Sequence, residues 1–232
     1  MKEKIIHVLC EGQTEQSFVE AVLKPYLMDC GVKAVKTVIV STKKNFRGGI
    51  VSYSQVKKDL LLMGAGFHDG QYERHLFTTM IDFYALPKDF PGYEDAQKVA
   101  DKYERISFLE AAFVEDIGMR GCFVPYLQLH EFEALVFCGI EYLLRIYPGR
   151  ERQCERLKAD LDCIGNPEMI NDSPDSAPSK RIIRAIEEAG GIRNYHYNKV
   201  SVGRDVTLLV GIENLRAQCL HFSNWVQRLL DT

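Results

Sequence analysis

The sequence predicts an α/β fold in which a mainly parallel sheet of four strands is flanked by helices and followed by a mostly helical extension. The first two-thirds of the chain alternates short apolar runs with segments of helical periodicity, which is the pattern of a parallel sheet with crossover helices. After Cys138 the strand signal fades and helical patterns remain. We therefore expect an α/β domain at residues 1–138 and a helical C-terminal extension at residues 139–232 that packs on it.

Each expected strand is a short apolar run that ends at a polar residue, as buried parallel strands do. The four runs are Ile5–Cys10, Ala34–Val40, His75–Ile81 and Cys122–Leu129. Helical patterns lie between and after them, at Thr14–Cys30, Ser54–Met63, Asp95–Asp116, Glu141–Tyr147, Arg150–Asp162, Ser179–Ala189 and Phe222–Leu230. Pro25 should kink or shorten the first helix, because proline cannot donate the helical hydrogen bond.

Composition excludes several classes of protein. Of the 232 residues, 46% are hydrophobic and the net charge is −3, which argues against disorder and against a uniformly basic nucleic-acid binder. No apolar run approaches the ~20 residues of a membrane span, and the apolar N-terminal run is too short for a signal peptide. The seven cysteines are odd in number and show no C-x-x-C spacing, so we expect reduced thiols and a cytoplasmic protein.

Acidic residues follow three of the four expected strands. Glu11 and Glu15 come after the first, Asp82 after the third, and Glu131 and Glu133 after the fourth. Open α/β sheets bind ligands beyond the carboxyl ends of their strands, so these side chains are expected to share one rim. Clustered carboxylates suit Mg²⁺ or Mn²⁺, and such a site suits phosphoryl transfer or phosphodiester hydrolysis.

Each acidic residue also has a structural interpretation. Glu11 and Glu15 favour a helix N-terminus, and Asp82 suits the turn that follows it. Glu131 and Glu133 point apart if their segment is helical and share a face if it is extended. His130 is either a general base or metal ligand, or a hydrogen-bonded structural histidine.

Basic residues supply the candidate phosphate contacts. Ser179, Lys180 and Arg181 open an expected helix whose free N–H groups favour anions, and Lys180 is placed to stabilise a transition-state phosphate. The alternative is a solvated helix turn with ordinary ion pairs. Residues 176–204 hold six basic and two acidic residues, so local positive charge is present despite the negative total. A basic loop with Lys43, Lys44 and Arg47 is a further candidate for contact with a nucleic-acid backbone.

The run Glu11-Gly12-Gln13-Thr14-Glu15, with Asp82 after a later strand, resembles the Toprim domain of topoisomerases, bacterial primases and OLD-family nucleases. The whole chain resembles a bacterial family placed beside these Toprim-like proteins. The motifs that carry this likeness are Asp82-Phe83-Tyr84-Ala85-Leu86-Pro87, His130-Glu131-Phe132-Glu133-Ala134-Leu135, Asn166-Pro167-Glu168 and Ala177-Pro178-Ser179-Lys180-Arg181.

The resemblance implies a Toprim-like, Rossmann-like fold with Mg²⁺ held by Glu11, Asp82 and Glu15. Toprim nucleases often carry D-x-D in the second acidic segment, whereas this chain has Tyr84 at the third position, so Glu131 or Glu133 would have to replace the missing ligand. The family also resembles components found near ATPases in bacterial defence against phage.

Three functions follow as expectations. The first is a Mg²⁺-dependent nuclease or phosphoryl-transfer protein that acts on nucleic acid, with Glu11, Asp82 and Lys180 as catalytic residues. The second is a non-catalytic partner or regulator of an ATPase, and the third is a metal-dependent enzyme of a small phosphorylated molecule.

Overall fold

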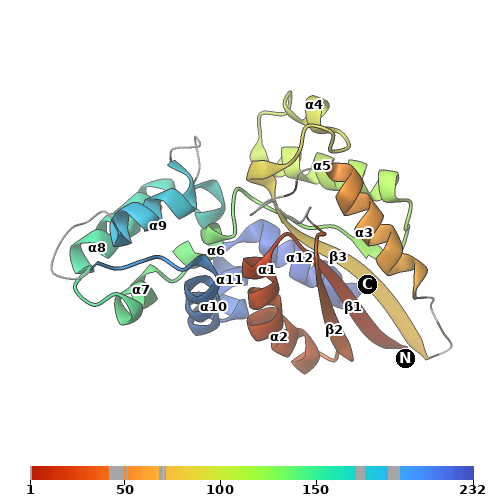
Figure 1. The fold of residues 1–232 in the computed structure, drawn as a ribbon, viewed down its shortest axis with the longest axis horizontal. Helices are drawn as coiled ribbons and strands as arrows, with labels where there is room; N and C mark the ends of the chain where they lie inside the picture. Colours follow the sequence, from red (N-terminus) through yellow and green to blue (C-terminus); the bar gives the residue numbers. More distant parts are fainter. Residues whose placement is uncertain are drawn as a thin grey trace.

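A computed structural model describes residues 2–41, 50, 52–67, 70, 72–170, 176–187 and 194–232. It confirms an α/β fold with a mainly parallel sheet (Figure 1). The strands are β1 (Glu3–Cys10), β2 (Ala34–Ile39), β3 (Glu73–Asp82), β4 (Phe123–Val124) and β5 (Leu127–Gln128). Their order is β2-β1-β3-β4, with β5 also paired to β3, and every pairing is parallel. Because Cys10 lies opposite Met80, Glu11 and Asp82 leave the sheet at the same edge.

The expected fourth strand is divided, so the described residues form a sheet of five strands instead of four. Pro125 separates β4 from β5 and has no N–H to donate to a ladder. The Thr79 side chain takes over at this point, because its Oγ1 accepts a hydrogen bond from the Tyr126 N–H and donates one to the Tyr126 carbonyl, each at 3.0 Å. The interruption therefore leaves the backbone of Tyr126 satisfied although it is buried.

Two apolar cores lie on opposite faces of the sheet. Alternate residues of β1 divide between them: Ile6 and Val8 belong to one core and Leu9 to the other. The core with Leu9 packs against α3 (Tyr53–Ala65) and α5 (Lys102–Ile117). The core with Ile6 is larger and is built from the first helical segment and from the C-terminal helices, so the sheet has helices on both faces (Figure 1).

The first helical segment differs from expectation at its start and its middle. It begins at Gly12, not Thr14, and consists of α1 (Gln13–Phe18), the π-helix η1 (Val19–Leu23) and α2 (Lys24–Asp29). The wider hydrogen-bonding pattern of η1 comes directly before α2, whose second residue, Pro25, lacks an N–H. The helical path therefore continues past the proline to Asp29, so the helix is not shortened at Pro25.

The expected helix at 95–116 is two helices. α4 (Tyr93–Ala96) ends early, and α5 starts afresh after Asp101, whose carboxylate accepts a hydrogen bond from the Glu104 N–H at 2.9 Å. Aspartate is a strong N-cap residue, so it begins a helix more readily than it continues one. A short 3-10 turn, η2 (Phe83–Ala85), follows β3.

The C-terminal region is helical, as expected. It contains α6 (Glu133–Phe137), α7 (Ile140–Ile146), α8 (Glu151–Ile164), the 3-10 turn η3 (Pro167–Met169), α9 (Pro178–Ile186), α10 (Lys199–Val210), α11 (Ile212–Gln218) and α12 (Leu220–Asp231). The sequence analysis did not assign α10 or α11. In Figure 1, α7, α8 and α9 form a lobe at the left, and α10, α11 and α12 lie between that lobe and the strands.

The C-terminal helices share their core with the sheet. α10 packs against α1, and a Cβ at Gly203 of α10 would lie 2.6 Å from Cε1 of Phe132, so only glycine allows this approach. From α12, the buried Trp225 stacks on Tyr126 and donates its indole N–H to Thr78 Oγ1 of β3 at 2.8 Å. Within the described part of the chain, no helix has the length and apolar character to cross a membrane.

Candidate functional site

Glu11 and Asp82 meet at the carboxyl edge of the sheet, as the sequence predicted. They follow β1 and β3, which are neighbours, and Glu11 Oε2 accepts a hydrogen bond from the Asp82 N–H at 2.9 Å. The Oδ1 atom of Asp82 is buried and has no hydrogen-bond partner among the described residues. A buried carboxylate oxygen without a donor is costly, so its retention needs a functional or ligand-based reason.

Glu15 joins this edge from the first turn of α1. Its side chain is only 6% exposed, and its Oε2 accepts a hydrogen bond from the Gly12 N–H at 2.8 Å. This bond caps the helix and holds the carboxylate against the strand end. Both predicted interpretations of Glu15 therefore apply, since it caps the helix and also lies among the other carboxylates.

Glu131 and Glu133 reach the same region from beyond β5. The segment becomes helical at Glu133, so the two side chains contact different helices. Glu131 Oε2 accepts a hydrogen bond from the Ser179 N–H at the start of α9, at 3.1 Å. Glu133 is 2% exposed, and its Oε1 lies 3.0 Å from Lys199 Nζ at the start of α10.

His130 shapes the backbone before Glu131. Its φ of 65° lies in the left-handed region, which residues other than glycine rarely adopt. Its carbonyl accepts a hydrogen bond from the Tyr84 N–H at 3.0 Å, which ties η2 to this turn. Such backbone strain is concentrated at functional sites, so the turn supports the placement of a site here.

We call Glu11, Glu15, Asp82, Glu131 and Glu133 the carboxylate cluster. Burial raises the pKa of Asp82 well above its usual value, and Glu11, Glu15, Glu133 and Glu131 raise it further. Burial, followed by Glu11, raises the pKa of Glu15 to about 7. Burial also raises the pKa of Glu11 and of Glu133, although the charge of Lys199 opposes the rise in both. The cluster therefore carries an electrostatic cost that a cation would reduce.

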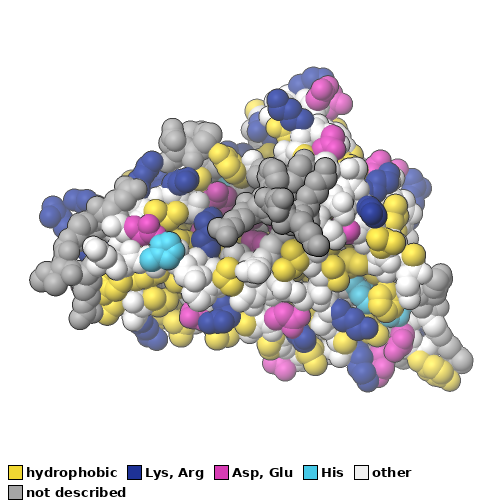
Figure 2. Space-filling model, in the orientation of Figure 1, with side chains coloured by type: hydrophobic (Ala, Val, Ile, Leu, Met, Phe, Trp, Pro, Cys, Tyr) yellow, Lys and Arg dark blue, Asp and Glu magenta, His cyan; other side chains and the backbone are white. Residues whose placement is uncertain are grey.

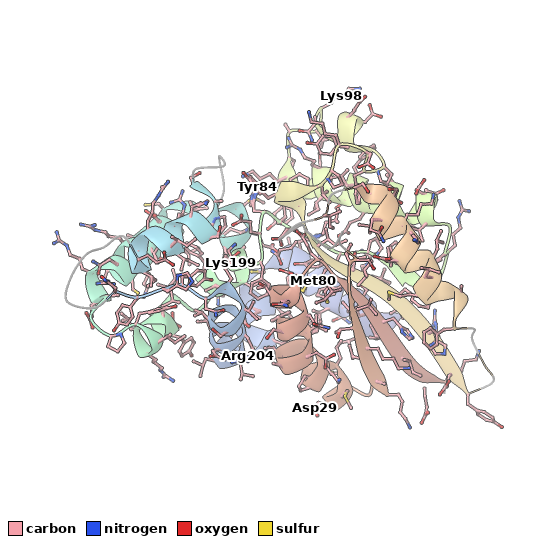
Figure 3. The ribbon with its side chains drawn as sticks, in the orientation of Figure 1. Asp29, Met80, Tyr84, Lys98, Lys199 and Arg204 are labelled. Atoms are coloured by element: carbon pink, nitrogen blue, oxygen red, sulfur yellow. The ribbon has the colours of Figure 1, made fainter. Side chains whose placement is uncertain are left out.

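Lys199 forms an ion pair with a member of this cluster, Glu133. Burial lowers its pKa, but Glu133, Glu131 and Asp82 outweigh that effect, and the net pKa is raised. Lys199 is the first residue of α10, and its side chain is 46% exposed (Figure 3). One amino group would balance only part of the charge that the cluster carries once its carboxylates are ionised.

The donor atoms of the cluster suit a divalent cation, but the side chains are not positioned around a common metal site. Its donors are carboxylate oxygens, which Mg²⁺ and Mn²⁺ prefer, and the Oδ1 atom of Asp82 has no other partner among the described residues. Within the described ranges, however, no group of three or more His, Cys, Asp or Glu side chains is arranged to hold a metal ion. Binding would therefore require side-chain rotation to complete a ligand set.

The three predicted phosphate-binding residues have different environments. The Ser179 N–H is taken by Glu131, so the first turn of α9 already has an anionic partner from the chain itself. Lys180 is exposed. Arg181 donates from Nε to the Ser176 carbonyl and from Nη1 to Asp160 Oδ2, both at 2.8 Å. Lys43, Lys44 and Arg47 lie outside the described residues.

Glu168, from the Asn166-Pro167-Glu168 motif, has a structural role. It is fully buried and accepts hydrogen bonds from the N–H groups of His221 and Phe222 at 3.0 Å, which caps α12. The Tyr103 hydroxyl donates to it at 2.8 Å. This carboxylate joins the helical extension to α5, and it is separate from the carboxylate cluster.

Sequence reasoning did not single out Lys199. It was counted only in the basic stretch 176–204, because α10 was not recognised. A local signal was present, since Asn198 caps α10 by accepting a hydrogen bond from the Ser201 N–H at 3.1 Å. Asparagine followed by Lys199-Val200-Ser201-Val202 is a plausible helix start. The approach of Lys199 to Glu133 depends on tertiary packing and has no local signal.

Fold and site together define an α/β protein with a partly buried carboxylate cluster beyond the ends of parallel strands. Residues 10–230 match the model of a family described as "Domain of unknown function (DUF4276)", and the chain belongs to that family. The match includes every member of the carboxylate cluster and Lys199. No curated protein and no solved structure matches the chain.

Proposed function

We propose that the protein is a Mg²⁺- or Mn²⁺-dependent phosphoryl-transfer protein, and specifically a nuclease that acts on nucleic acid. The observation that carries this proposal is the buried Asp82 Oδ1, which lacks a donor among the described residues and lies among carboxylates with raised pKa values. Such a set of groups is costly without a ligand and becomes favourable around a divalent cation. When bound, the cation would activate water and stabilise charge on phosphate oxygens.

The residues of the chain have separate tasks in this proposal. Glu11 and Asp82 would be the metal ligands, because they follow adjacent strands and the Asp82 backbone N–H holds the Glu11 carboxylate beside the Asp82 position. Glu15 is the third candidate ligand, held in place by the Gly12 N–H. Glu131 and Glu133 increase the negative potential, and they connect the cluster to α9 and α10.

Lys199 has a different position in this proposal from the predicted Lys180. The Lys199 ammonium is beside the carboxylates, so it can contact a phosphate group that approaches them. The exposed Lys180 lies next to Ser179, whose N–H contacts Glu131. Lys180 is therefore kept as an outer phosphate contact, and Lys199 is added as an inner one.

The test is metal-dependent cleavage. Purified protein is incubated with plasmid, single-stranded DNA and RNA in the presence of Mg²⁺, Mn²⁺ or EDTA. Glu11→Gln and Asp82→Asn are the test variants, since they remove a charge with little change in shape. Glu115→Gln is the matched control, because Glu115 is exposed and pairs only with Arg120 among the described residues. The proposal expects cleavage by wild type and Glu115→Gln, and its loss in both test variants.

Two results contradict the proposal. Cleavage that persists in Glu11→Gln and Asp82→Asn would show that the cluster is not the active site. Absence of both cleavage and Mn²⁺ binding by calorimetry would favour the non-catalytic regulator.

A further inference from the structure

A cavity of about 690 Å³ lies between α8 and α9, outside the carboxylate cluster. Its volume is in the range of small-molecule sites, which is roughly 300–1,000 Å³. Three arginines line it together with Asp160, and Leu157 and Ala185 add an apolar wall. The arginines are Arg156, Arg181 and Arg184. Figure 2 shows Lys and Arg side chains gathered over this lobe at the left of the molecule.

The positive charge of the cavity is only partly neutralised. Arg181 is fixed by Asp160 and by the Ser176 carbonyl, and its side chain is 22% exposed. Arg156 and Arg184 are exposed, and among the described residues neither has an ion pair or a hydrogen bond to a side chain. Two guanidinium groups without a partner in the described structure therefore remain beside an apolar wall.

One helix, α9, contacts the carboxylate cluster and also lines the cavity. The Ser179 N–H of this helix contacts Glu131, and Arg181 and Arg184 follow on the same helix. At about 1.5 Å of rise per residue, they lie about 3 and 8 Å further along the helix axis than Ser179.

We propose that the α8–α9 cavity binds a phosphate-bearing nucleotide unit. Guanidinium groups hold phosphate through paired hydrogen bonds and can stack on a base, and Leu157 and Ala185 provide apolar contact for a base or sugar. The link to catalysis rests on the proposed function: the unit in the cavity adjoins the phosphate that reacts at the carboxylate cluster. The substrate class is then a nucleotide or a single-stranded nucleic acid, not a simple phosphate ester.

The test measures binding without metal, so it does not depend on catalysis. Fluorescence anisotropy with a labelled single-stranded 12-nucleotide DNA is measured in EDTA, with a mononucleotide, inorganic phosphate and poly-glutamate as competitors. Arg156→Ala and Arg184→Ala are the test variants. Arg152→Ala is the matched control, because it removes the same charge from exposed α8 without lining the cavity. All three positions are exposed, and circular dichroism confirms that each variant folds.

Each test variant should weaken DNA binding about tenfold, as expected for loss of a charged hydrogen bond, whereas Arg152→Ala should change it less than about twofold. Competition by the mononucleotide supports a site for a free nucleotide, and binding of the strand alone supports a site for single-stranded nucleic acid. Equal losses in Arg184→Ala and Arg152→Ala would overturn the inference. So would competition by poly-glutamate or by inorganic phosphate as effective as that by the mononucleotide.

The two proposals fail in different ways. If Arg184→Ala loses binding but Glu11→Gln still cleaves, the cavity remains a nucleotide site and the assigned catalytic site is wrong. If Glu11→Gln loses cleavage but Arg184→Ala binds DNA like Arg152→Ala, the nuclease proposal remains and the cavity is not the substrate site.

Discussion

Glu15→Gln should remove the loss of folding stability that ionisation of Glu15 causes as pH rises. Burial, followed by Glu11, raises the pKa of Glu15 from 4.5 to about 7 in the folded protein. A group whose folded pKa is raised contributes stability that is full below the unfolded pKa and is lost as pH rises through the folded pKa. The whole difference corresponds to about 3 kcal/mol, and about 2.5 kcal/mol of it falls between pH 5 and pH 8. Glutamine cannot ionise, and its carbonyl can still accept the Gly12 N–H.

The wild-type pH profile alone would conceal this effect. Burial, followed by the charges of His75 and Lys36, lowers the pKa of His7 to about 4. The stability that His7 contributes is therefore present above pH 6.5 and is lost as pH falls toward 4, which is the opposite direction. The difference between wild type and Glu15→Gln cancels the His7 contribution, because both proteins contain it.

The assay is urea unfolding in EDTA at pH 5 and pH 8 for wild type, Glu15→Gln and Glu20→Gln. From pH 5 to pH 8, the free energy of unfolding of Glu15→Gln should increase by about 2–3 kcal/mol relative to that of wild type. Glu20 is the control on the same helical segment. Its pKa is lowered despite some burial, by its bonds to Lys24 and Thr37, so it is ionised at both pH values and its removal should give no pH-dependent change. If the free energies of unfolding of wild type and Glu15→Gln differ by the same amount at both pH values, the raised pKa of Glu15 is refuted.

Three further predictions concern stability. Lys199→Met should cost about 1–3 kcal/mol at pH 8 in urea unfolding, because it leaves buried carboxylates without their cation, and Lys199→Arg should recover most of the loss. Gly203→Ala should cost about 1–3 kcal/mol through its clash with Phe132, whereas Gly66→Ala, with its nearest atom at 3.9 Å, should be close to neutral by the same assay. Glu168→Ala should lower stability by about 2–4 kcal/mol by uncapping α12, and an unchanged melting temperature would contradict its structural role.

The parts of the fold that depend on local pattern could be predicted. The apolar run at 5–10 becomes a strand because its side chains are buried on both faces, and the same holds for 75–81. Their neighbouring positions then bring Glu11 and Asp82 together. The expected strand at 122–129 was wrong in one respect, since Pro125 divides it, and this proline was visible in the sequence.

The parts that depend on long-range packing could not be predicted. Lys199 reaches Glu133 only because α10 packs on α1, and Gly203 is needed where α10 approaches Phe132. The α8–α9 cavity is likewise lined by Arg181 and Asp160, which pair although they are 21 residues apart. The residue pattern of neither helix predicts this pairing. The same limit explains why Ser179 was assigned to an external phosphate when Glu131 contacts its N–H.

The raised pKa values predict how the proposed metal binding would depend on protonation. A divalent cation binds deprotonated carboxylates, so its affinity must rise with pH while the cluster loses its protons. For one proton with a pKa of about 7, the apparent Mn²⁺ affinity should rise roughly 20-fold between pH 5.5 and pH 7.5, by calorimetry. Glu15→Gln should bind Mn²⁺ more weakly and with a smaller pH dependence, whereas Glu20→Gln should match wild type. If Mn²⁺ binds with the same affinity at both pH values, its ligands are not the buried carboxylates, even if the protein proves to be a nuclease.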